Sequence, residues 1–307
     1  ASQRREISMM KTLVNDIEAR GEKAPEHRDV ATLRLGPKVP PPTASAAEVP
    51  QGFRVEVVMS GLTYPTSVEF DDDGTMYVAE AGYSYGDSSV EPRILRVSTD
   101  GRVEVIARGP SLSGPVNDLL WHRGRMYVSH RGRISILEPD GAVRDLVTGL
   151  PSDGDHHNNQ LTVGPEGRIY FGQGTATNSG VVGLDNFKMG WLKDHPDFHD
   201  IPARNIALVG RIFESANPLR TTDEIVRTLP FHPFGKAAAE DLIVPGQVKA
   251  SGTILRMNDD GSGLEVYAWG LRNPFGLMWS PDGTLYATEN GFDVRGSRPI
   301  ADDQEDI

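Results

Sequence analysis

A strand–turn–strand unit with a glycine in its turn recurs along the chain. The turns of the four clearest copies are Asp73-Gly74, Arg123-Gly124, Glu166-Gly167 and Asp282-Gly283. Alternating apolar residues precede each turn, and a second apolar stretch follows it. This pattern around a glycine-containing turn is typical of β-hairpins. We therefore expect the chain to be built mainly from antiparallel strands.

Each of the first three copies is completed by a second hairpin. The additional strands are predicted at residues 93–97 and 103–106, at 134–137 and 143–147, and at 253–257 and 264–267. Four-stranded units that recur at a spacing of about 40–50 residues indicate the blades of a β-propeller. The sequence thus predicts an all-β fold with three complete blades and half of a fourth. Since blades bury their faces against one another, we expect the remaining blades to come from residues beyond Ile307 or from a second chain.

Two segments fall outside this repeat. Residues 1–49 are expected to form an amphipathic helix and a proline-rich strap, because apolar residues at helical spacing precede a run of prolines. Residues 50–307 form the predicted propeller, and residues 175–249 are an insertion expected to build a rim over one face. Within this insertion, His195 and His199 are four residues apart, but the intervening proline disfavours a helical metal pair.

Charge and composition exclude several functions. The formal net charge of -12 disfavours binding to nucleic acid, which requires clustered lysine and arginine side chains. No apolar run approaches the roughly 20 residues that a membrane-spanning helix needs, so we expect no membrane span. The chain has no cysteine, which excludes disulfides and thiolate metal sites within it.

The cluster Asp155-His156-His157 occurs once, directly before the first strand of the third predicted blade. Histidine exchanges protons near neutral pH, so His156 is a candidate general base with Asp155 beside it. The alternative interpretation is a turn whose polar side chains bond the backbone. We expect His157 to lie on the surface or to support its neighbours.

Four segments carry a family resemblance. Residues 155–174, 252–258, 270–277 and 289–293 resemble, in order and spacing, the soluble quinoprotein glucose dehydrogenase or glucose/sorbosone dehydrogenase family. The resemblance covers roughly residues 50–307. Its most specific element is residues 270–277, which read Gly-Leu-Arg-Asn-Pro-Phe-Gly-Leu.

The resemblance implies a fold, an activity and a location. The fold would be a six-bladed propeller that binds pyrroloquinoline quinone (PQQ) and Ca²⁺ near its central channel. The activity would be oxidation of an aldose or a related alcohol, with electrons passed to an external acceptor such as a quinone or a cytochrome. Members of this family imply a periplasmic or secreted protein.

Specific roles follow from the resemblance. His156 would take the proton of the sugar hydroxyl, and Asp155 would orient His156 and stabilise its charged form. Arg272 and Asn273 would hold the cofactor, since arginine binds carboxylates and quinone oxygens through charge-assisted hydrogen bonds.

Further positions complete the implied site. Asn117, or alternatively Ser113, and Gln173 are the other candidate cofactor-binding residues. Gly291 and Phe292 would offer backbone carbonyls to Ca²⁺, which accepts such oxygen ligands. The family usually has Gly-Pro where this chain has Gly291-Phe292. It also has a basic residue soon after the histidine that this chain lacks, which removes one cation from the predicted pocket.

Three alternatives remain open. The chain could be a calcium-dependent, lactonase-like hydrolase in which a metal polarises an ester and a carboxylate or histidine activates water. It could instead be a propeller that binds ligands without catalysis. Arg272 and Asn273 could also form a structural lock between blades rather than a cofactor site.

Overall fold

The computed structural model describes residues 49–83, 89–209, 212–220, 224–237, 242–293 and 295–298, together with the backbone of Arg34–Leu35. The helix and most of the strap predicted within residues 1–49 lie outside these residues. None of the helices among the described residues has the length and apolar character needed to cross a membrane.

Three consecutive antiparallel sheets of four strands each make up the main body. The first contains β3 (Pro65–Phe70), β4 (Met76–Glu80), β5 (Arg93–Val97) and β6 (Val103–Arg108). The second contains β7 (Val116–His122), β8 (Arg125–His130), β9 (Arg133–Leu137) and β10 (Val143–Val147). The third contains β11 (Asn158–Val163), β12 (Ile169–Gln173), β17 (Thr253–Met257) and β18 (Glu265–Trp269).

Two smaller sheets flank this series. β19 (Pro274–Trp279) pairs with β20 (Leu285–Glu289) after the third sheet, and β1 (Arg34–Leu35) pairs with β2 (Met59–Ser60) before the first. The strands of each large sheet are ordered along the chain, so each sheet is an up-and-down meander. The prediction of three complete units and half a fourth is confirmed.

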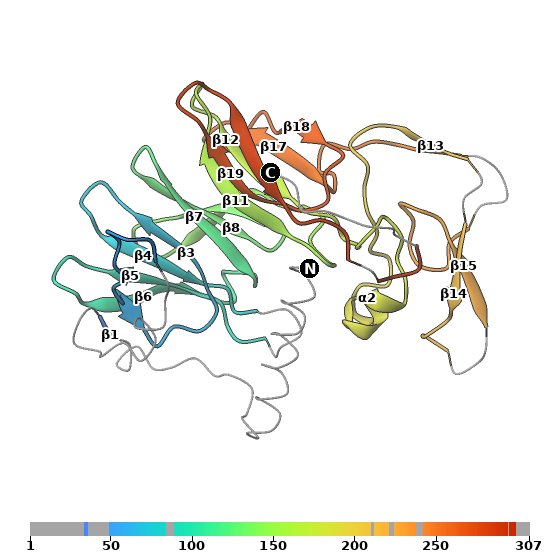
Figure 1. The fold of residues 1–307 in the computed structure, drawn as a ribbon, viewed down its shortest axis with the longest axis horizontal. Coiled ribbons are helices and arrows are strands. Elements are labelled where there is room, and N and C mark those ends of the chain that lie inside the picture. The colour runs from blue at the N-terminus through green and yellow to red at the C-terminus, as the bar shows by residue number, and fades with distance from the viewer. Residues whose placement is uncertain are drawn as a thin grey trace, which may run out of the picture.

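Consecutive sheets contact one another through their first strands. β3 contacts β7, β7 contacts β11, and β11 contacts β19, so these four strands lie side by side and the sheets fan out from them (Figure 1). This is the arrangement of β-propeller blades, with the first strands innermost. We therefore call the sheets blades one to three, and β19–β20 the start of blade four.

Six of the hairpin turns among the described residues share one geometry. Gly101 donates its N–H to the carbonyl of Ser98 at 2.8 Å with a φ of 85°, and Gly261 donates to Asn258 in the same way. Glycine adopts positive φ without steric cost, as this bulged hairpin loop requires. The equivalent glycines, with φ between 78° and 87°, are Gly74, Gly141, Gly167 and Gly283.

The core lies between blades. One buried cluster joins blades two and three and includes Tyr127, Ile134, Ile169, Phe171 and Leu255, all with essentially no exposed surface. A second cluster joins blades one and two. Because a blade is covered on both faces, its central strands are apolar on both sides.

Side chains near the start of each first strand bind the next blade. A bulge shifts the register there in all four first strands, which frees side chains to face the neighbouring blade. The amide or hydroxyl donors and their carbonyl acceptors are Thr66 to Val116 (2.7 Å), Asn117 to Asn158 (2.7 Å) and Asn159 to Pro274 (3.1 Å).

The next residue of each first strand accepts a hydrogen bond in return. The side-chain acceptors and the backbone N–H donors of the following blade are Ser67 with Leu119 (3.1 Å), Asp118 with Leu161 (2.8 Å) and Gln160 with Leu277 (2.7 Å). We call each donor–acceptor pair of neighbouring residues a latch. In blade four these positions hold Phe275 and Gly276, whose side chains cannot form it.

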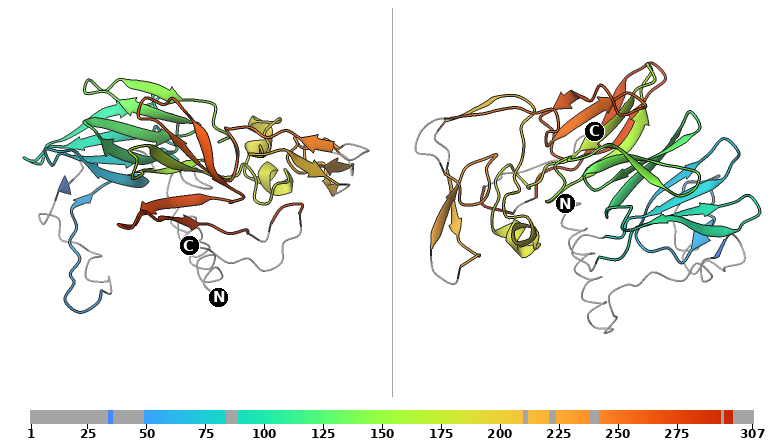
Figure 2. Two further views of the ribbon diagram at one scale, coloured as in Figure 1. Left: turned by 90° about the horizontal axis from the view of Figure 1, so that it is seen from above. Right: turned by 180° about the vertical axis from the view of Figure 1, so that it is seen from behind.

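The segment between β12 and β17 leaves the blades and projects to one side (Figure 2). Its elements are α2 (Leu184–Lys188), α3 (Trp191–Asp194), β13 (Ile206–Leu208), β14 (Phe213–Ala216), β15 (Ile225–Thr228) and β16 (Leu242–Val244). β13 pairs with β16, and β14 pairs with β15. Within this insertion, the buried carboxylate of Asp200 accepts hydrogen bonds from Ala176 and Thr177 near its start.

Candidate functional site

One edge of the blades collects the polar residues singled out in the sequence. In an antiparallel pair, the start of the first strand and the end of the second lie at the same edge. His156 precedes β11, Arg272 and Asn273 precede β19, Thr175 follows β12, and Asp293 follows β20. The meander therefore brings residues more than a hundred positions apart to one edge.

His156 is held in a defined tautomer. Its Nδ1 lies 2.9 Å from the carbonyl oxygen of Thr175. A carbonyl only accepts, so Nδ1 carries the proton and Nε2 presents a lone pair. The side chain is 12% exposed. Burial, together with nearby Arg272, lowers the pKa of His156 to about 3, so the ring is neutral at pH 7 and Nε2 is available as an acceptor.

Asp155 is fully buried between two arginines. Its Oδ2 accepts a hydrogen bond from Arg295 and lies 3.7 Å from Nη2 of Arg272. The same oxygen is 4.0 Å from Nε2 of His156. Burial raises the pKa of Asp155, and the two arginines oppose this rise. Asp155 therefore faces the reactive nitrogen of His156, whereas Thr175 fixes the orientation of the ring.

Arg272 is enclosed by the protein. Its Nε and Nη2 donate to the backbone and side-chain oxygens of Asn178 at 2.9 and 2.7 Å, and Nη1 donates to the carbonyl of Asn290 at 3.2 Å. Nη2 also contacts Asp293 at 3.3 Å, and the guanidinium lies 5.8 Å from the ring centre of Phe292. This arrangement joins the insertion to the segment after β20, and a lock between blades stays a prediction.

Asn273 and Gly174 pack against His156. Asn273 is buried, and its Oδ1 accepts a hydrogen bond of 2.8 Å from Asn159. A Cβ atom on Gly174 would lie 2.6 Å from this oxygen and still closer to the Cβ of His156. Only glycine therefore allows the imidazole and the Asn273 amide to approach so closely.

Arg295 is the main residue that the sequence interpretation missed. It donates to Asp185 at 3.0 Å and to Asp293 at 3.1 Å in addition to Asp155. Its pKa is raised, because these carboxylates outweigh the effect of burial. A second cation thus stands beside Asp155, although the family's basic residue after the histidine is absent. The tertiary structure alone reveals this, since Arg295 is 140 positions from Asp155.

The other predicted cofactor-binding residues lie in different surroundings. Asn117 belongs to the latch between blades two and three, and the N–H of Ser113 donates to Nδ1 of His130 at 3.0 Å. Gln173 is fully buried, and its amide donates to the carbonyl of Pro151 at 2.9 Å. A role for these residues in cofactor binding stays a prediction.

The predicted calcium ligands lie near Arg272. Gly291 and Phe292 are partly buried in the segment after β20, where the Phe292 ring packs against the guanidinium. Within the described residues, no group of three or more histidine, aspartate or glutamate side chains is placed to hold a metal ion. A calcium site at these carbonyls stays a prediction.

The fold and the candidate site together define the class of protein. The chain is an all-β protein of propeller blades, and one edge of the blades carries a neutral histidine beside a buried Asp155–Arg295–Arg272 cluster. No protein-family model and no curated protein sequence matches it.

Several solved propellers are similar in structure. The PQQ-bound aldose sugar dehydrogenase from Streptomyces coelicolor is 19% identical, with a TM-score of 0.45 over 78% of this chain and 61% of that one. A putative gluconolactonase is 13% identical, with a TM-score of 0.41 over 80% and 64%. Virginiamycin B lyase from Staphylococcus aureus is 13% identical, with a TM-score of 0.31 over 74% and 64%. The chain spans less than two thirds of each, and TM-scores below 0.5 say nothing about its function.

Proposed function

We propose that the chain belongs to a β-propeller oxidoreductase that acts on a sugar or a related alcohol, with His156 as general base. The observation that carries this proposal is the fixed tautomer of His156. Its Nδ1–H is held by Thr175, so Nε2 is the acceptor beside Asp155.

The chemical role of His156 follows from this geometry. Nε2 would accept the proton of a substrate hydroxyl, and the imidazolium so formed would face the carboxylate of Asp155. Burial, followed by Arg272 and Arg295, disfavours this charge and lowers the pKa of His156. The proton affinity of His156 Nε2 therefore depends on the opposing effects of one carboxylate, Asp155, and two cations, Arg272 and Arg295.

The residues offered for PQQ fit that cofactor poorly. The nitrogens of Arg272 already donate to Asn178, Asn290 and Asp293, and the amide oxygen of Asn273 is taken by Asn159. A cofactor carboxylate would have to displace the acceptors that already occupy Arg272. The family resemblance supports PQQ and Ca²⁺ as hydride acceptor and Lewis acid, but we derive no step through either.

This poor fit favours a second candidate function. A lactonase-like hydrolase needs a base that deprotonates water, and Nε2 of His156 could serve that purpose equally well. The hydrolase requires no hydride acceptor, so the occupied donors of Arg272 do not count against it. A propeller that binds a ligand without catalysis is the third possibility.

One experiment separates these functions. Purified protein is mixed with PQQ and Ca²⁺, and we measure quinone absorbance and dye-linked oxidation of a panel of aldoses and alcohols. Hydrolysis of D-glucono-1,5-lactone, with and without Ca²⁺, is measured in parallel. Oxidation that His156→Gln abolishes supports the oxidoreductase. Lactone hydrolysis without quinone uptake supports the hydrolase, and activity that survives His156→Gln removes this residue from the base role.

The remaining proposals concern partners and location. An external electron acceptor, either a quinone or a cytochrome, would complete the oxidation, and we propose a periplasmic or secreted location on the basis of the resemblance. A further sheet of the same kind, from residues outside this chain or from a second chain, is proposed to pack on the exposed blade faces. No nucleic-acid partner is proposed, because the net charge is -12.

A further inference from the structure

A cavity adjoins the Asp-His-His cluster at His157. Its volume is about 340 Å³, within the usual range for small-molecule sites. Blades one, two and three and the insertion all contribute to it. The residues that line it are Gly82, Tyr83, Ser89, Val90, Pro92, Gly114, Arg131, His157, Met189, Trp191, Asp194 and His195.

His157 supplies a fixed acceptor to this cavity. Its Nδ1 lies 3.0 Å from the carbonyl of Ser152, so Nδ1 carries the proton and Nε2 is left as an acceptor. Burial, together with nearby Arg131, lowers the pKa of His157 to about 3. The centres of the His157 and Tyr83 rings are 6.2 Å apart, and the rings are nearly perpendicular at 84°. His157 is therefore a neutral, oriented acceptor rather than a cation.

Arg131 supplies donors to the same cavity. Its Nε donates to Ser152 at 2.9 Å, and its Nη2 lies 3.2 Å from Nε2 of His195 and 3.4 Å from Asp153. These contacts hold the guanidinium in place. Nη1 has no partner among the described residues and can donate to a ligand.

Two aromatic side chains form an apolar wall. Trp191 is 8% exposed, and its side chain hydrogen-bonds to the Tyr83 hydroxyl. The lining carries one cation, Arg131, and one carboxylate, Asp194, so its formal charges cancel. Balanced charge, mixed donors and acceptors, and an aromatic wall suit an uncharged ligand that has both hydroxyl groups and an apolar face.

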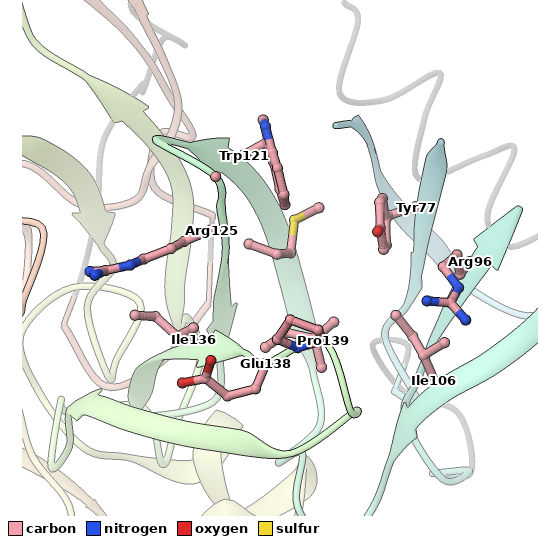
Figure 3. A pocket seen from close by; sticks show the side chains of 11 residues that line it. Tyr77, Arg96, Ile106, Trp121, Arg125, Ile136, Glu138 and Pro139 are labelled. Carbon is pink, nitrogen blue, oxygen red and sulfur yellow. The ribbon is translucent and has the colours of Figure 1, made fainter. Parts of the chain in front are cut away.

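The cavity between blades one and two provides a contrast (Figure 3). It holds about 190 Å³, and Tyr77 faces it from blade one while Trp121 faces it from blade two. Its charged side chains at Arg96 and Glu138 are already paired with Glu104 and Arg144. It is a gap in inter-blade packing without oriented polar groups.

We propose that the cavity at Tyr83, Arg131 and His157 binds a neutral monosaccharide ring. Arg131 would donate to ring hydroxyls, Nε2 of His157 would accept from one, and Tyr83 and Trp191 would cover the apolar face. His157, which lines the cavity, adjoins the proposed base His156 in the chain. The inference deepens the proposed function and rests on it for the link to catalysis, but not for binding.

Binding can be measured without turnover. Trp191 is one of four tryptophans, so titration with D-glucose, D-galactose and D-xylose should change the intrinsic fluorescence in a saturable way. Isothermal titration calorimetry confirms the affinity independently. Loss of a charge-assisted or neutral hydrogen bond should weaken binding about tenfold in Arg131→Gln and in His157→Phe. Circular dichroism and thermal melts identify any variant that fails to fold.

Two controls make the test specific. Arg125→Gln alters an arginine that lines the other cavity and should bind sugar with unchanged affinity. Trp191→Phe should remove the fluorescence change while calorimetry still detects binding. The inference is overturned if none of the three sugars binds saturably, or if folded Arg131→Gln and His157→Phe bind as tightly as the parent.

The inference and the proposed function can fail separately. His156→Gln should retain sugar affinity while it loses turnover, because His156 does not line this cavity. Turnover that persists when no sugar binds here would overturn the inference alone. Sugar binding without any turnover would leave the inference standing and count against the oxidoreductase.

Discussion

The carboxylate of Asp118 in blade two accepts a hydrogen bond of 2.8 Å from the backbone N–H of Leu161 in blade three. Asp118 is also the acceptor for the hydroxyl of Ser67 in blade one, at 2.8 Å. One buried carboxylate therefore connects three successive blades. Burial raises its pKa from 3.8 to about 6, so this link is sensitive to pH in the mildly acidic range.

Asp118→Asn should change the pH dependence of stability. A raised carboxyl pKa means that the folded state favours the protonated form, so this contribution to stability is complete below pH 4 and is lost as pH rises through about 6. The loss amounts to about 3 kcal/mol. The difference in unfolding free energy between parent and Asp118→Asn should shift in favour of the variant between pH 4 and 7. A constant difference over this range would contradict the raised pKa.

Val68 and Leu119 occupy the same position in blades one and two but should respond differently to truncation. Val68 is 55% exposed, whereas Leu119 is 2% exposed because it packs against blade one. Leu119→Ala should lower the unfolding free energy by about 2–5 kcal/mol, and Val68→Ala by about 0.5 kcal/mol or less. Chemical denaturation at two protein concentrations checks this. A large, concentration-dependent cost at Val68 would show instead that another chain covers this face.

His156 should not titrate near neutral pH. With a pKa of about 3 instead of 6.5, its ring resonances should stay constant between pH 5 and 8 in NMR spectra, with His156→Gln used for assignment. Catalysis through Nε2 should accordingly show no acid limb near pH 6.5. An inflection at that pH that disappears in His156→Gln would refute the buried, cation-flanked environment.

The same shift has a consequence for stability. The folded pKa of His156 is depressed, so its contribution is present above pH 6.5 and is lost as pH falls toward 3, where the unfolded chain binds the extra proton. The unfolding free energy of the parent should therefore fall by about 1.4 kcal/mol per pH unit more steeply than that of His156→Gln. Parallel slopes would contradict the low pKa.

Arg272→Ala should lower the stability of the protein even when no ligand is bound. Removal of one member of a buried ionic and hydrogen-bonded cluster costs about 3–5 kcal/mol, and this change would leave Asp155 with Arg295 as its remaining cationic partner. Thermal denaturation of the cofactor-free protein measures the loss. Weakened quinone binding with an unchanged melting temperature would instead support the cofactor role predicted from the sequence.

Gly174→Ala should disturb the proposed base. The added Cβ would press on His156 and on Asn273, so activity should fall in addition to a stability loss of about 1–3 kcal/mol. Gly172→Ala in β12 is the control, because its Cβ would meet the backbone of Pro274 in β19 and not His156. If both variants lose the same activity for the same loss of unfolding free energy, the effect is not specific to His156.

Local pattern determined most of the fold. The alternating strands and glycine turns predicted the three complete blades, because the period of side-chain exposure and the need for positive φ are properties of short segments. Asp155 and His156 were noticed as a cluster of titratable residues, whereas Arg272 and Asn273 were candidates through the family resemblance. The structure brings these four residues together.

The tertiary structure decided which groups face one another. Arg295 joins Asp155 across 140 positions, and Thr175, rather than Asp155, holds Nδ1 of His156. Asn117 appeared in the sequence as a cofactor ligand, yet its amide serves a latch that only the packing of neighbouring blades creates. The alternation of apolar residues in the sequence determines which segments form strands. The direction, burial and charge state of a side chain depend instead on residues from distant parts of the chain that lie at the same edge of the sheets.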